Sequence, residues 1–157
     1  MSLSIEYYLA GSGWAECKVQ FGEARCEVSA SYLSDALGNL VLAAVAVLAG
    51  AHSISVGFDE EPGEYRWAIA RSGNNQIDIR LLEFQELWGN RPDAEGKVLM
   101  HFAVEPLDFG EAVAAAASRV LEQYGLAGYK DKWVQHSFPS AQLDLLNEYL
   151  ARWRRDR

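Results

Sequence analysis

The stretch SDALGNLVLAAVAVLAGA, residues 34–51, decides the fold of this chain. Its larger apolar side chains recur at helical spacing and most other positions hold alanine or valine, which predicts a helix buried on more than one side. Ser34 is the expected N-cap, Asp35 suits the positive helix start, and Gly50 ends the helix. Residues 53–84 then change to period-two alternation, which indicates strands.

Alternation of apolar and polar residues predicts three strands before this helix and four after it. The expected strands are residues 4–10, 15–21, 25–30, 54–58, 65–69, 77–84 and 98–104. The parity changes between Leu81 and Leu82, which indicates a bulge near Leu81 or the end of a strand. A second helix is expected from residue 108 to Gly125, and a third from residue 139 or 140.

These patterns predict an α+β fold with the element order βββ-α-ββββ-αα. Short turns join consecutive strands, so we expect one antiparallel sheet of about six or seven strands with the helices packed on one face. A chain of 157 residues with 50% apolar content suits a single globular domain over residues 1–157.

The charge balance bears on the class of partner. The chain carries 22 acidic and 14 basic residues, a net charge of -8, which disfavours binding to a phosphate backbone and hence to nucleic acid. The same charge suits solubility or a basic protein partner. The first residues lack a basic and apolar signal pattern, and the longest apolar stretch falls short of the roughly 20 residues a bilayer needs. We therefore expect a cytoplasmic protein without membrane association.

Residues with catalytic chemistry form no recognisable motif. The three histidines, His52, His101 and His136, have no metal-ligand spacing among themselves or with cysteine. Cys17 and Cys26 face the same way in neighbouring expected strands, and we interpret them as two small reduced core residues rather than a redox pair. The sequence thus predicts no catalytic residue, no metal and no cofactor.

Two other segments leave alternatives open. The turn DEEPGE, residues 59–64, is acidic and carries Pro-Gly, and it reads as a solvated turn, a cation site or an anchor for a basic partner. The aromatic segment GYKDKWVQHSFP, residues 128–139, either packs the last helix against the body or forms a recognition surface.

YLSDALGNL at residues 32–40 and EEPGEYRW at residues 60–67 resemble stretches of small bacterial proteins of uncharacterised function. In size, acidity and α+β pattern the chain also resembles immunity proteins, which neutralise polymorphic toxins. This second resemblance is one of general character and transfers no functional residue. It implies a cytoplasmic inhibitor that acts by binding.

The function we expect is a non-enzymatic, cytoplasmic protein-binding domain, of the kind that includes an immunity-type inhibitor of a basic toxin. Its candidate partner-binding residues are Asp59, Glu60, Glu61, Glu64 and Trp88. One alternative is a structural domain that forms a homodimer through its mixed outer sheet face. Another is a small enzyme or ligand binder with a pocket between sheet and helices.

Overall fold

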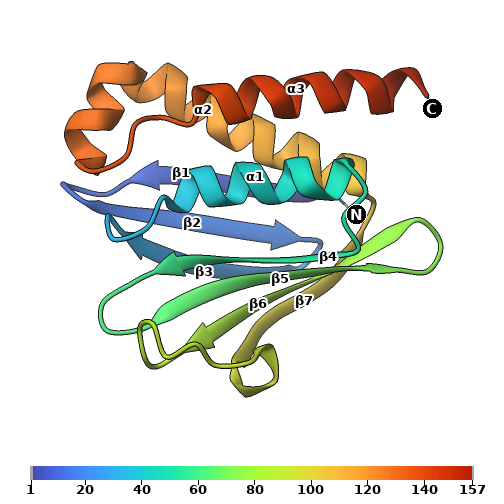
Figure 1. Cartoon of the computed structure of the whole chain (residues 1–157), viewed down its shortest axis with the longest axis horizontal. Helices are drawn as coiled ribbons and strands as arrows, with labels where there is room; N and C mark the ends of the chain where they lie inside the picture. The colour runs from blue at the N-terminus through green and yellow to red at the C-terminus, as the bar shows by residue number, and fades with distance from the viewer. Residues whose placement is uncertain (1, 157) are drawn as a thin grey trace.

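The computed structural model describes residues 2–156. These residues form seven strands, three α-helices and one short 3-10 helix, η1 (Figure 1). In chain order they are β1 (Leu3–Leu9), β2 (Trp14–Phe21), β3 (Ala24–Ser31), α1 (Ala36–Leu48), β4 (Ser53–Asp59), β5 (Glu64–Ser72), β6 (Gln76–Phe84), η1 (Asp93–Glu95), β7 (Lys97–Val104), α2 (Pro106–Trp133) and α3 (Ser140–Arg155). The α+β class and the predicted element order are confirmed.

The strands fall into two antiparallel sheets, with orders β1-β2-β3 and β4-β5-β6-β7, rather than into the single sheet we expected. The chain passes through α1 between β3 and β4, and the two strands meet through side chains instead of a ladder. Ser31 Oγ donates to the main-chain oxygen of Asp59 at 3.1 Å. The register shifts between Leu81 and Leu82 where β6 pairs with β7, which confirms the predicted bulge.

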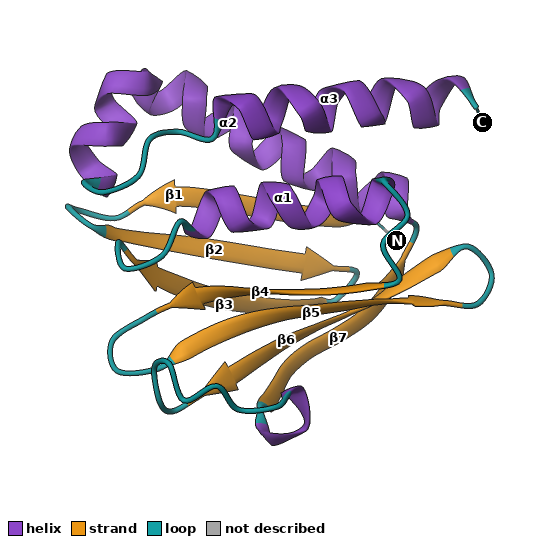
Figure 2. Cartoon of the chain, viewed as in Figure 1, coloured by secondary structure: helices purple, strands orange, loops and turns teal. Residues whose placement is uncertain are grey.

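The helices stack in two layers above the strands (Figure 2). Helix α1 packs on β4 and α2 packs on β1, whereas α3 packs on α1 and α2. Side chains of both sheets and all three helices join in one buried core. Side chains such as Leu37, Trp67 and Phe109, each 0% exposed, fill space between the helices and the sheets.

Side chains from the helices bind main-chain groups on one edge of each sheet, at β1 and at β4. The hydroxyl of Tyr124 accepts from the main-chain N–H of Leu9 at 3.2 Å and donates to its oxygen at 3.3 Å, along the edge of β1. On the edge of β4, Asn39 Nδ2 donates to the oxygen of Gly57 at 3.0 Å. These hydrogen bonds occupy main-chain groups that could otherwise pair with another strand.

The start of α1 differs by one residue from our expectation. Asp35, not Ser34, caps the helix, and its carboxylate accepts from the N–H of Gly38 at 3.2 Å. The hydroxyl of Ser34 instead contacts β4, where it accepts from the N–H of Asp59 at 3.0 Å. The capping side chain stabilises the helix start, and its neighbour fastens that start to the sheet.

The aromatic segment after Gly125 is part of the core. Gly125 interrupts α2 with φ of 70°, where the sequence predicted a helix end, but the chain then resumes a helical course to Trp133. Tyr129 and Trp133 are 0% exposed, and Phe138 packs edge-on against Tyr129 at 5.5 Å between ring centroids. The packing interpretation is therefore confirmed, and these rings are not a recognition surface.

The two cysteines lie on neighbouring strands, β2 and β3. Both thiols are free, and burial raises the pKa of the Cys17 thiol, which keeps it protonated and unreactive. Cys17 lies opposite Val28 and Cys26 opposite Val19, so the two cysteines are diagonal neighbours.

No helix within residues 2–156 has the length and apolar character to cross a membrane.

Replacing Tyr129 by phenylalanine tests the cost of a buried hydroxyl. This hydroxyl has no hydrogen-bond partner among the described residues, so Tyr129→Phe should leave the free energy of unfolding unchanged or raise it by about 1 kcal/mol in urea denaturation. The control Tyr124→Phe removes a hydroxyl that is hydrogen-bonded to the main chain of β1, and it should lower the free energy of unfolding by about 1 kcal/mol. Equal losses in both variants would contradict this account.

Candidate functional site

Two segments meet at one end of the four-stranded sheet (Figure 1). Strands β4 and β6 end there and β5 and β7 begin there, so the turn at residues 60–63 and the loop at residues 85–96 are neighbours. Residues 59–66 and 83–97 carry eight acidic and three basic side chains, a net -5 of the chain's -8. We name Asp59, Glu60, Glu61, Glu83 and Glu86 the acidic end, and residues 85–96 the strap.

Trp88 lies in the strap and, at 70%, is the most exposed of the large apolar side chains within residues 2–156. Its indole Nε1 donates to Asp59 Oδ2 at 3.2 Å, and the N–H of Leu87 donates to the oxygen of Pro62 at 2.7 Å. The structure thus joins two of our candidate residues that are 29 positions apart in the chain.

The backbone of Trp88 adopts a left-handed conformation, with φ of 59°. This region is unfavourable for a bulky aromatic residue, because its Cβ crowds the following carbonyl. Strained residues of this kind persist only where surrounding contacts hold them, and they cluster at functional sites. Exposure and strain together mark Trp88 as a residue whose position does not serve packing.

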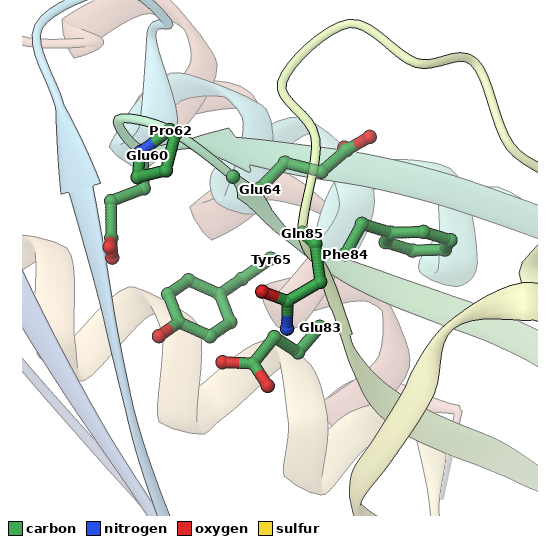
Figure 3. A pocket seen from close by; sticks show the side chains of 8 residues that line it. Glu60, Pro62, Glu64, Tyr65, Glu83, Phe84 and Gln85 are labelled. Carbon is green, nitrogen blue, oxygen red and sulfur yellow. The ribbon is translucent and has the colours of Figure 1, made fainter.

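Glu60 turns towards β3, where Ser29 Oγ donates to its carboxylate. Together with Tyr65, Glu83 and Gln85 it lines a surface pocket of about 90 Å³ (Figure 3). Burial, and then the carboxylates of Glu60 and Glu83, raise the pKa of the Tyr65 phenol.

The thiol of Cys26 lies within electrostatic range of Tyr65 and Glu83, which line this pocket. Burial raises its pKa, and the nearby carboxylates of Glu83 and Glu27 raise it further. A phenol and a thiol that both stay protonated at neutral pH are weak nucleophiles, because the reactive species is the anion. The pocket therefore offers negative charge and hydrogen-bond acceptors rather than a reactive group.

Glu64 and Tyr65 lie on opposite faces of β5, and in Figure 3 the side chain of Glu64 points away from Tyr65. Its Oε1 accepts from Arg66 Nη2 at 3.1 Å, and only 12% of the side chain is exposed. Glu61 is exposed in the turn. The candidate set therefore divides: Asp59, Glu60, Glu61 and Trp88 gather at the acidic end, whereas the carboxylate of Glu64, opposite Asp59, is held in an ion pair with Arg66.

Sequence reasoning missed Glu83, Glu86 and Arg66. Glu83 lies near the end of β6, just before the strap, at a position that faces inwards like the alternate residues before it. It is directly opposite Tyr65. A carboxylate at an inward-facing position of an apolar strand is a signal that could have identified it. Glu86 and Arg66 stand in no such pattern: Glu86 reaches this end only through the folded strap, and the contacts of Arg66 exist only once the strap lies over β5.

No group of three or more His, Cys, Asp or Glu side chains within the described residues 2–156 is arranged to hold a metal ion. Comparison of the chain with protein-family models, curated proteins and solved structures gives no match.

Trp88→Asn tests whether Trp88 contributes to stability. Because the indole is 70% exposed and asparagine tolerates the left-handed backbone, we expect the free energy of unfolding to stay within about 1 kcal/mol of the wild-type value in urea denaturation. Trp153→Asn is the matched control: this half-buried indole donates to the oxygen of Leu48 at 2.9 Å and its loss should cost about 3 kcal/mol. A comparable loss for Trp88→Asn would make Trp88 a packing residue.

Proposed function

We propose that this chain is a non-enzymatic protein-binding domain whose acidic end docks on a basic surface of a partner protein. The observation that carries the proposal is Trp88, an exposed indole held by Asp59 in an unfavourable backbone conformation. Tryptophan is enriched among the few interface residues that supply most of the binding free energy, and a side chain fixed before binding loses little entropy.

Electrostatics supports the same partner chemistry. More than half of the net negative charge of the chain lies in the two segments around Trp88. Complementary charge steers a basic partner towards this end and excludes acidic ones, while the indole provides apolar contact area. Glu61 and Glu86 are exposed, Glu86 in a surface ion pair with Arg91 Nη2 at 3.4 Å, whereas Glu64 is only 12% exposed and pairs with Arg66.

The finer form of the proposal is an immunity-type inhibitor in the cytoplasm. Toxins that act on nucleic acids or other anions have basic active sites, and an acidic end with a fixed aromatic anchor would cover such a site. Inhibition by occlusion needs shape and charge complementarity but no catalytic residue, which agrees with a Tyr65 phenol and a Cys26 thiol that stay protonated.

Affinity capture with matched variants tests this function. Tagged wild-type protein, Trp88→Ala and the double variant Glu61→Lys with Glu86→Lys are incubated with native lysate, and captured proteins are quantified by mass spectrometry at about 0.05 and 0.3 M salt. A basic partner should bind the wild type, weaken at the higher salt, and lose at least about tenfold in affinity in both variants.

The control variants make the same types of substitution, with the same change in charge, at other places on the surface. Trp14→Ala removes another exposed indole, 39% exposed and at the start of β2. Glu122→Lys with Glu148→Lys reverses two exposed charges on the helices. Partners that bind all variants equally, or that the two control variants also lose, would refute docking at the acidic end.

Self-association is a second candidate, and one observation favours it. The outer face of the four-stranded sheet holds a groove of about 490 Å³, lined by the small side chains Ser53, Ser55, Ala68 and Ala70 and flanked by charged ones. A copy of the chain could place its own sheet face there around a two-fold axis. Light scattering at high protein concentration should then give twice the monomer mass, and a strictly monomeric mass would exclude this candidate.

A further inference from the structure

The guanidinium of Arg66 is the centre of the contacts that hold the strap. Its Nη1 donates to the main-chain oxygen of Arg91 at 2.8 Å and to Asp93 Oδ1 at 2.9 Å. Its Nη2 donates to Glu64 Oε1 at 3.1 Å, and its plane lies over the ring of Phe84, 4.1 Å from the centroid. Only 13% of the side chain is exposed, so these interactions are weakly screened by solvent.

The strap covers a small apolar cluster on the outer face of the sheet. Ala68, Leu82 and Phe84 form this cluster, separate from the main core. Gly96, at the end of the strap, approaches it so closely that a Cβ there would lie 2.7 Å from the Phe84 ring. The cluster is small, and it cannot by itself fix a loop that contains two non-glycine residues with positive φ, Trp88 and Asn90.

We propose that Arg66 is the positioning residue of this site: by clamping Arg91 and Asp93 onto β5 and Phe84, it holds the strap in the conformation that presents Trp88. The clamp acts on the side of the strap after Trp88, while Pro62 and Asp59 hold the side before it. The effect of Arg66 on the order of the strap is independent of any partner. Only the effect of Arg66 on partner affinity rests on the proposed function.

Arginine is the residue type this role requires. One planar group reaches a carboxylate, a second carboxylate and a carbonyl in fixed directions while its face stacks on an aromatic ring. Lysine keeps the charge but offers neither the fork nor the stacking plane, so Arg66→Lys should release the strap. This also explains the place of Glu64, which orients Arg66 and does not face a partner.

Amide hydrogen exchange of the strap is the test. The N–H groups of Leu87, Glu95 and Gly96 are hydrogen-bonded and report on strap order. In Arg66→Lys they should exchange at least about tenfold faster, while amides of α1 and the β2 ladder stay as in the wild type. The matched control is Arg80→Lys, since Arg80 approaches the same Asp93 at 3.7 Å but is 38% exposed and makes no other ion pair or hydrogen bond with the strap among the described residues.

A second variant covers the case in which Arg66→Lys is unstable. Glu64→Gln with Arg66→Met removes both charges, so no buried carboxylate is left unpaired, and it should free the strap to the same extent. Acrylamide quenching of Trp88, taken as the difference between each protein and its Trp88→Phe counterpart, gives an independent spectroscopic signature. Quenching should rise in both Arg66 variants and stay unchanged in Arg80→Lys.

Wild-type exchange and quenching in both Arg66 variants would overturn the assignment, and so would equal changes in Arg80→Lys. If the strap loosens but no captured partner distinguishes Trp88→Ala from the wild type, the positioning role of Arg66 stands and the proposed function fails. If the partner depends on Trp88 while the strap stays ordered without Arg66, the proposed function stands and the positioning role fails.

Discussion

Burial of α1 on most of its sides, with Leu42 left 44% exposed, is the constraint on which the rest of this structure depends. Ten of its 13 residues are buried, and a helix without a polar face cannot lie at a surface. The strands can cover only one side, so α2 and α3 must enclose the others. The side chains at the start of α1 also close the edge of β4, which ties the core helix to the sheet that carries the acidic end.

The acidic end owes its character to a division of charges between two faces of β5. On one face Glu64 and Asp93 are neutralised by Arg66, and that ion-pair group holds the strap in place. On the other side the carboxylates of Glu60 and Glu83 remain together beside Tyr65 without a basic group within ion-pair distance among the described residues. Charges that stabilise the site and charges that would attract a partner are thus close in sequence but serve separate purposes.

Much of the fold could be read from periodicity. Helical spacing located α1, alternation located all seven strands, and the parity change at Leu81 located the bulge. The division into two sheets could not be read in this way, because alternation reports which face of a strand is buried and not which strand lies beside it. Of the candidate residues, Asp59 and Trp88 do meet, whereas Glu64 pairs with Arg66; their role in partner binding stays a prediction.

By itself the sequence determined the α+β class, the order of elements, the buried helix and the concentration of negative charge, because these follow from local spacing and composition. Only the tertiary structure decided that the strap returns to the acidic turn, that Arg66 clamps it, and that Trp88 stands exposed in a left-handed conformation. The physical reason is that these contacts join residues some 25 to 29 positions apart, and their geometry exists only after the sheet has formed.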